Sequence, residues 1–356
     1  MPSAEQANPF VRLVEDALRQ GAKPRFTAGP GRSAVELGAE KAIELGLVKT
    51  RRSFVRRLER AEKSGLVPDW DLWKPARYHM HPPRAQVFNP APHVASDLEP
   101  GGDIDEVLVI PDLHQCPRHP HRADVLTWCA RLGSERKIKK VVQLGDWLSM
   151  DSCSRHDRNE TVKGRTKPSI EQDLESLADS LAAWERGRDP TWKPRKVVTL
   201  GNHEDRLRCF ENEHPEINGS FTDRMEEMWL QHGWTTKPFG EIHYINGVGF
   251  THAPLIHGRA MTGKNAASSI ANESACSLIH GHTHKFNVVR RPKIGPLDHV
   301  TIIEAGCALP YGEIEAYARN DSMTGWWWGV TVVRIQAGAI LDWDCISMKT
   351  MRERYA

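Results

Sequence analysis

The chain has 356 residues, of which 39% are hydrophobic and 26% are charged, and its formal net charge at pH 7 is +2. This balance is ordinary for a globular protein and excludes a chain that is disordered throughout. Apolar runs are too short to span a membrane, and the polar N-terminal sequence does not have the layout of a signal peptide, so we expect a cytoplasmic protein without a membrane partner.

Residues 1–73 are expected to form a small helical domain. The segment "PFVRLVEDALRQG" ends at a glycine, and "SAVELGAEKAIELG" begins at Ser33 as a helix cap and ends at Gly46. A third helix is expected to begin near Thr50. Short helices joined by tight turns predict a helix-turn-helix.

The third of these helices is strongly basic. Residues 49–63 carry seven Lys or Arg against two Glu, a local charge of +5. Arginines on such a helix suit the phosphates and base edges of a DNA major groove, so we expect DNA as a partner. The candidate contacts are Arg51, Arg52, Arg56 and Arg57. The alternative is a solvated helix whose Phe54, Val55 and Leu58 pack inward.

The rest of the chain is expected to consist of a linker and one large domain. Residues 74–104 contain six prolines and a Gly-Gly-Asp break, which predicts a linker. Over residues 105–356 helical stretches alternate with short apolar runs, which are expected to be buried strands: "EVLVI", "KKVVQL", "RKVVTL", "GVGFT", "CSLI" and "VTIIEA". Apolar residues at helical spacing from Ile170 to Trp184 predict a helix between two of them. This alternation favours an α/β layered domain.

Metal-binding side chains follow five of the predicted strands. They are, in chain order, Asp112 and His114, then Asp146, then Asn202 and His203, then His252, and finally His282 and His284. In open α/β sheets, ligands gather beyond the carboxyl ends of strands, so these residues are expected to converge. The glycines at 145, 201 and 281 fit the sharp chain exits that such an arrangement requires.

The donor types narrow the choice of metal. Oxygen and imidazole ligands without a thiolate suit Mn²⁺, our first choice, or Fe, Zn²⁺ or Ni²⁺, rather than a cysteine-rich zinc site or a calcium site. Seven ligands are too many for one such ion. Two ions about 3.5–4 Å apart that share one carboxylate would use all seven, clamp a phosphoryl group and activate a water molecule. The sequence therefore predicts a two-metal hydrolase.

The ordered series D-x-H, G-D, G-N-H-E, H and G-H-x-H resembles the calcineurin-like metallophosphoesterases over roughly residues 105–310. The resemblance implies a layered sandwich of β-sheets flanked by helices. It also implies a first metal site formed by Asp112, His114 and His284. The second metal site would be formed by Asn202, His252 and His282, and the carboxylate of Asp146 would bridge the two ions. His203 would contact the phosphate and act as the general acid for the leaving oxygen, a role that suits imidazole near neutral pH.

Substrate-binding residues are less clearly indicated. Many phosphoprotein phosphatases of this family continue the second motif as GDxxDRG, whereas "GDWLSMDS" lacks that arginine. Arg206, in "GNHEDR", is our candidate for a substituted phosphate clamp. Lys264, in a glycine-flanked loop, is a second candidate for substrate binding, and a solvated loop lysine is the alternative.

Several other histidines compete for a role. His257 is the rival of His252 as a ligand, and we prefer His252 because it directly ends the strand "GVGFT". His280 lies on a strand and is expected to be structural or to support a ligand. Cys116, His119 and His121 suggest zinc, but their spacing matches no common site, so we expect an exposed loop on the substrate side.

These observations favour a two-metal phosphoesterase with an appended DNA-binding module, and specifically a nuclease. The layout resembles phage-encoded metallophosphoesterases and, at the motif level, DNA-repair exonuclease subunits. One alternative is a phosphatase or phosphodiesterase that acts on small molecules or phosphoproteins. A second alternative is a non-catalytic DNA-binding regulator, which the complete ligand set and the additional His203 disfavour.

Overall fold

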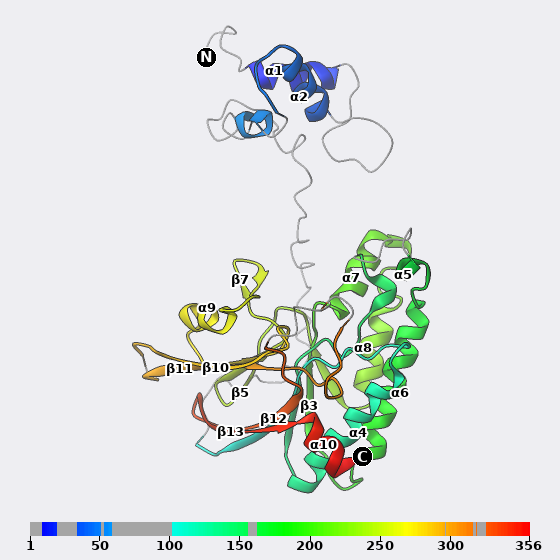
Figure 1. Ribbon diagram of the computed structural model, residues 1–356, viewed down its shortest axis with the longest axis vertical. Coiled ribbons are helices and arrows are strands. Elements are labelled where there is room, and N and C mark those ends of the chain that lie inside the picture. The colour runs from blue at the N-terminus through cyan, green and yellow to red at the C-terminus, as the bar shows by residue number, and fades with distance from the viewer. Residues whose placement is uncertain are drawn as a thin grey trace. The chain divides into compact units, whose positions relative to one another are not determined.

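The computed structural model describes residues 9–19, 34–50, 53–58, 102–155, 162–295, 297–315, 318 and 325–356 (Figure 1). The chain divides into two compact units, residues 1–93 and 94–356. Among the described residues, no helix is both long and apolar enough to cross a membrane.

The N-terminal unit contains helices α1 (Pro9–Arg19) and α2 (Ala34–Glu44) and a helical segment at residues 53–58. Phe10 and Phe54 are buried, and their rings meet edge to face with centroids 5.8 Å apart. Helix α2 is followed by a tight turn at Gly46, whose φ of +68° favours glycine. The expected helices are therefore present, whereas the predicted Ser33 cap and most of the predicted linker lie outside the described residues. The boundary at residue 73 stays a prediction.

The C-terminal unit contains a six-stranded sheet that combines parallel and antiparallel pairs. Its strand order is β13 (Ala339–Ser347), β12 (Gly329–Gln336), β1 (Asp105–Ile110), β2 (Lys140–Gln143), β3 (Arg195–Thr199) and β4 (Trp234–Lys237). Strands β1 to β4 are parallel, while β12 is antiparallel to both β1 and β13. The carboxyl ends of β1, β2 and β3 therefore lie at the same edge of the sheet.

A five-stranded sheet faces the first one. Its strand order is β10 (Phe286–Pro292), β11 (His299–Ala305), β9 (Leu278–His280), β6 (Val248–Thr251) and β5 (His243–Ile245). Strands β11, β9 and β6 are parallel. A separate hairpin consists of β7 (Leu255–Ile256) and β8 (Arg259–Ala260).

Helices cover the outer faces of this two-sheet sandwich (Figure 1). The α-helices are α4 (Ala123–Arg136), α5 (Val162–Arg165), α6 (Ile170–Gly187), α7 (Glu204–Glu213), α8 (Thr222–Gln231), α9 (Ala266–Glu273) and α10 (Met348–Tyr355). Short 3-10 helices are η2 (Pro120–Arg122), η3 (Asp151–Cys153) and η4 (Pro215–Ile217). Helices α4, α6 and α10 pack in the core beside the six-stranded sheet, and α9 packs against the five-stranded one.

Strand β1 illustrates how the sequence produces these layers. Alternate residues of a strand point to opposite faces. Leu108 and Ile110 lie in the core that the helices share, and Val107 and Val109 lie in the core between the two sheets, together with Phe250 of the second sheet. Since both faces are covered there, residues 107–110 of the strand are all apolar and buried, as is typical of parallel strands.

The predicted fold class, a layered α/β sandwich flanked by helices, is confirmed. All six strands expected from apolar runs are present. Ser169 caps the N-terminus of helix α6 and forms the reciprocal hydrogen bonds of a capping box with Gln172. The prediction was incomplete at the C-terminus, because the long antiparallel pair β12 and β13 was not anticipated.

Candidate metal centre

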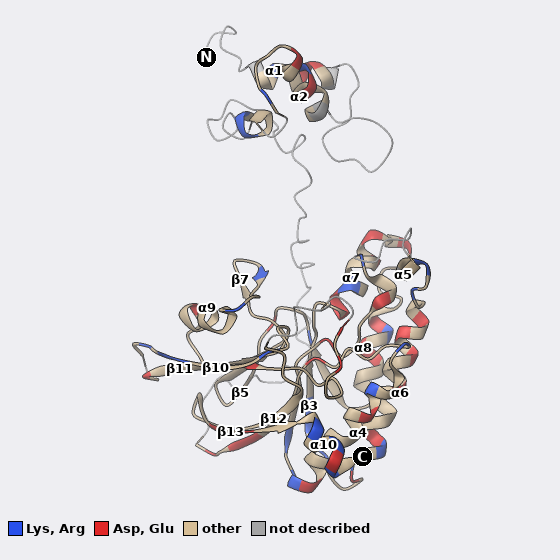
Figure 2. Cartoon of the chain, viewed as in Figure 1, with Lys and Arg blue, Asp and Glu red and all other residues tan. Residues whose placement is uncertain are grey.

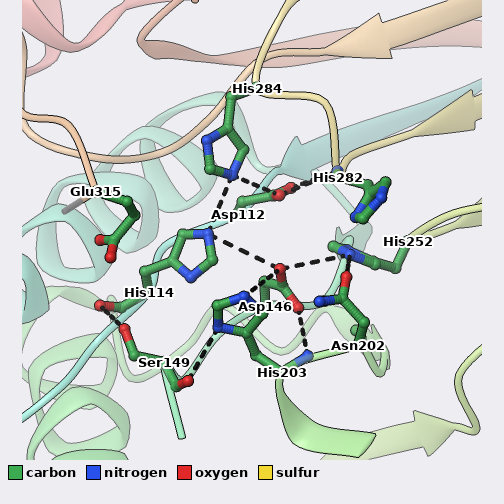
Figure 3. Close-up of polar contacts among 12 residues, drawn as sticks. Asp112, His114, Asp146, Ser149, Asn202, His203, His252, His282, His284 and Glu315 are labelled. Carbon is green, nitrogen blue, oxygen red and sulfur yellow. Dashed lines mark hydrogen bonds and ion pairs between the residues drawn. The ribbon is translucent and has the colours of Figure 1, made fainter. Parts of the chain in front are cut away.

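The structure brings the seven predicted ligands together at the carboxyl ends of the strands (Figure 3). The loops after β1, β2 and β3 contribute ligands from the six-stranded sheet, and those after β6 and β9 contribute them from the other sheet. Parallel strands explain this convergence, because their carboxyl ends share an edge. The contributing residues are Asp112, His114, Asp146, Asn202, His252, His282 and His284.

Three of these residues form a first group of potential ligands. The Nε2 atom of His284 lies 3.0 Å from Oδ2 of Asp112 and 3.0 Å from Nε2 of His114. Their ligand atoms all lie within 4.8 Å of one another, and the three side chains are buried. This group corresponds to the predicted first site.

A second group contains Asp146, His252 and His282, again with ligand atoms within 4.8 Å of one another. The Oδ1 atom of Asn202 lies 3.0 Å from Nε2 of His252 and adds a neutral oxygen. Asp146 connects the two groups, because its Oδ2 atom lies 3.8 Å from Nε2 of His114 and 3.5 Å from Nε2 of His252. Its position fits a shared carboxylate.

The electrostatics of the cluster fit bound cations. Burial and the neighbouring Asp112 carboxylate raise the pKa of Asp146 well above its usual range. A cation placed between two buried carboxylates would offset this cost. Burial also lowers the pKa of His114 well below its usual range and that of His282 to about 4, so both imidazoles are neutral at pH 7, the form that binds metal.

The comparison with known proteins agrees with this geometry. The family model of calcineurin-like phosphoesterases matches residues 106–286. The chain belongs to this family. It is therefore a metal-dependent phosphoesterase, a hydrolase of phosphoric esters, and its donor set fits two divalent ions.

Among solved structures, the phosphoesterase is similar to a dimetal phosphatase from Danio rerio, at 11% sequence identity and a TM-score of 0.31. The similarity covers 68% of this chain and 99% of that one. No curated protein matches.

The backbone of the phosphoesterase is strained at four of its candidate ligands. The backbone φ values are +50° at His114, +48° at Asp146, +69° at His282 and +57° at His284. These values lie in the left-handed region, which residues other than glycine rarely adopt. Such conformations persist only where the surrounding structure enforces them, and they concentrate at functional sites.

Two glycines leave room for the carboxylates. A Cβ atom at position 281 would lie 2.2 Å from Oδ1 of Asp112, and one at position 201 would lie 2.1 Å from Oδ1 of Asp146. Of the three predicted sharp exits, only Gly145 has a positive φ, at +81°. The chain also turns or bends directly after Gly201 and Gly281, but their φ values are not positive, and glycine is required there for space.

Buried partners outside the ligand set hold the loops in place. The carboxylate of Glu204 accepts hydrogen bonds from the backbone amides of Asp146, Leu148 and Gly201, at 3.0, 2.8 and 2.7 Å. It therefore joins the loops after β2 and β3. His252 is oriented by its Nδ1 atom, which lies 2.7 Å from the carbonyl oxygen of Leu144, so its Nε2 atom faces the cluster.

Sequence reasoning missed the role of Glu204, although it is the last letter of the motif "GNHE". The available signal was an acidic residue in the first turn of a helix that follows a glycine turn. It also missed Arg122, which is 1% exposed and donates from Nη1 to the carbonyl oxygen of His114 at 2.6 Å and to Oε1 of Glu315 at 2.6 Å.

His203 lies at the edge of the ligand cluster. Its Nδ1 atom is 2.9 Å from the carbonyl oxygen of Ser149, and its Nε2 atom is 3.8 Å from Oδ2 of Asp146 (Figure 3). The Nη2 atom of Arg206 donates to Nε2 at 2.9 Å. Burial and this guanidinium hold the pKa of His203 well below its usual range. His203 also forms a group of potential ligands with His114 and Asp146. Its side chain is therefore placed where it could act either as a general acid or as a metal ligand.

The remaining candidates lie in different surroundings. His252 is buried in the cluster, whereas its rival His257 is exposed in the turn between β7 and β8. Lys264 is exposed in the loop before α9, and its contact with substrate stays a prediction. His280 is buried on β9, and its Nδ1 atom lies 3.0 Å from the carbonyl oxygen of Gly281, next to the ligand loop.

Proposed function

We propose that this phosphoesterase uses two divalent ions, with Mn²⁺ expected, to cleave phosphodiester bonds in DNA. The observation that carries the two-ion proposal is the position of Asp146, which belongs to the second group of potential ligands and also lies 3.8 Å from Nε2 of His114 in the first. When bound, such a pair of ions polarises the phosphoryl oxygens and supplies a hydroxide at neutral pH.

The protein's own residues position the substrate and move the proton. In the present hydrogen bonding, Nδ1 of His203 donates to Ser149, and Nε2 accepts from Arg206. A substrate phosphate that takes over the hydrogen bond of Arg206 frees Nε2 to take up a proton from solvent. The resulting imidazolium, stabilised by the bound phosphate, donates that proton to the departing alkoxide and returns to the neutral form. His203 acts as the general acid, and Arg206 acts as the phosphate clamp.

Exposed arginines of the N-terminal unit support DNA as the substrate. Arg56 and Arg57 are exposed on the helical segment at residues 53–58, whose Phe54 and Leu58 are buried. Figure 2 shows basic residues in blue on this segment. The guanidinium of Arg57 also lies 4.9 Å from the ring centroid of Phe10. The segment therefore combines an inward apolar side with outward charge, while Arg51 and Arg52 lie outside the described residues.

The substrate class is tested with purified protein and Mn²⁺ on linear, circular and single-stranded DNA, beside p-nitrophenyl phosphate and bis-p-nitrophenyl phosphate. We expect cleavage of DNA and of the diester. Arg56→Gln should weaken DNA binding and reduce the slope of log affinity against log salt by about 1, with diester hydrolysis unchanged. Lys41→Gln, a matched change on α2, should alter neither. Equal effects of both changes, or no DNA cleavage by the wild type, would contradict the nuclease proposal.

A phosphatase that acts on small molecules or phosphoproteins is the second candidate. The observation that favours it is Arg206, a half-buried cation 2.9 Å from His203, which suits the extra charge of a terminal phosphate. Hydrolysis of the monoester well above that of the diester, together with intact DNA, would favour this candidate.

A further inference from the structure

A separate group of potential ligands lies outside the seven-residue cluster. His119, His121 and Glu313 each offer one ligand atom, and these atoms lie within 4.8 Å of one another. The two histidines belong to the loop between β1 and α4, and Glu313 belongs to the segment between β11 and β12. The group therefore joins two segments that are distant in sequence.

The local backbone holds the two histidines together. Pro120, between them, begins the 3-10 helix η2 with His119 as its N-cap residue. The amide of His119 donates to the carbonyl oxygen of Cys116 at 3.0 Å, and the amide of Arg122 donates to that of His119 at 3.1 Å. The centroids of the two imidazole rings lie 5.9 Å apart, and the ring planes are nearly perpendicular. Proline and this turn restrict the backbone that carries the two histidines.

Glu313 is oriented by a buried partner. The Nε atom of Arg122 donates to Oε2 of Glu313 at 3.2 Å, while Oε1 lies 2.5 Å from Nε2 of His121. The backbone of Glu313 is also fixed, because its carbonyl oxygen accepts from Nε1 of Trp328 at 2.6 Å. One carboxylate oxygen is thus held from behind, and the other faces the histidines, as in metal sites whose ligands are oriented by hydrogen bonds.

An ordinary ion pair does not account for the whole arrangement. The side chains of His121 and Glu313 are 51% and 30% exposed, and an exposed pair of this kind contributes little to stability. A pair would also need only one imidazole, whereas the second imidazole lies within the same ligand distance. Two imidazoles and one carboxylate are a common ligand set for zinc with an open fourth position.

We propose that His119, His121 and Glu313 bind one divalent transition-metal ion, for which Zn²⁺ is the best match. A cavity of about 690 Å³ is lined by His121 and Glu313 as well as by Tyr311, Lys349 and Arg352, which leaves room for water or an anion as the fourth ligand. The ion ties the loop that carries His114 to the segment that carries Glu313 and Glu315. Both segments already meet at Arg122, so binding stiffens the outer wall of the catalytic centre.

The test compares zinc content after equilibrium dialysis of the full-length protein against Zn²⁺. His121→Ala and Glu313→Gln keep all seven ligands of the catalytic centre, so the loss of one zinc ion, with the remaining zinc still bound, reports this site. We expect wild type and the control His257→Ala, which changes an exposed histidine elsewhere, to bind one zinc ion more than His121→Ala does. Glu313→Gln should weaken the binding of this additional zinc ion at least 10-fold.

Anomalous scattering at the zinc edge locates the ion independently of folding in the variants. A peak bounded by His119, His121 and Glu313 in wild-type crystals is expected. Equal zinc content in wild type and folded His121→Ala, or the absence of a peak at these residues, would overturn the proposal.

Discussion

Gly281→Ala should displace one metal ligand without changing any donor. The added Cβ atom would lie 2.2 Å from Oδ1 of Asp112, whereas its next nearest neighbours, Cγ of Asp112 and Cβ of Leu144, are at 3.4 and 3.5 Å. Only the carboxylate is in the way, and it must move by roughly 1 Å to regain ordinary contact. The φ of Gly281 is not positive, so alanine adds no comparable backbone strain.

A shift of this size should weaken the first metal site and slow hydrolysis by roughly 100-fold, the usual cost of a 1 Å misplacement at a reacting centre. The assay is Mn²⁺-dependent hydrolysis of bis-p-nitrophenyl phosphate, with a metal titration of each variant. Gly102→Ala is the control, because a Cβ there has no neighbour within 4 Å. If Gly281→Ala binds metal and hydrolyses the diester as well as wild type does, the assignment of Asp112 as a ligand held in this position is refuted.

Three further predictions concern the bridge, the acid and the fold. Asp146→Asn should lower the metal content, measured by elemental analysis, more than any other single ligand change, because its carboxylate faces both groups. His203→Gln should keep both metals and lose on the order of 10²–10⁴-fold in rate on substrates with alkoxide leaving groups, but less with p-nitrophenolate, which departs without a proton. Equal losses on both substrates, or loss of metal, would make His203 a ligand. The buried His243 has no hydrogen-bond partner at either ring nitrogen, and its pKa is lowered to about 4, chiefly by burial. Protonation of His243 therefore favours the unfolded state. Its effect on the free energy of unfolding is absent above about pH 6.5, the pKa in the unfolded chain, and reaches a loss of about 3 kcal/mol as the pH falls through about 4. His243→Phe should therefore reduce acid sensitivity in denaturant titrations at pH 4 and 7, and the exposed control His257→Phe should not.

The convergence of the seven candidate ligands could be predicted because each of them follows an apolar strand. Asp112 and His284 are 172 positions apart, yet the shared edge of parallel strands makes their approach an expectation from topology alone. The strands themselves were visible as short apolar runs, since both faces of β1, β2 and β3 are covered.

Other features depend on contacts that a single sequence does not reveal. Glu204 matters because it is buried against the amides of Asp146 and Leu148, and neither its burial nor those partners follow from local pattern. Likewise, His121 meets Glu313 across 192 positions, so the spacing of histidines in "HQCPRHPHR" gave no indication of a third ligand. The two glycines at 201 and 281 were expected for their chain turns, and the structure adds that each leaves space for a carboxylate that follows another strand.

The central claim is that seven residues bind two divalent ions that are required for phosphoester hydrolysis. The most direct measurement is a titration of chelator-treated protein with Mn²⁺ that follows bound metal and hydrolysis of bis-p-nitrophenyl phosphate together. We predict no activity in the metal-free protein, and full activity once both sites of the seven-residue cluster are filled. Hydrolysis by the metal-free protein, or folded protein that takes up no Mn²⁺, would contradict this account.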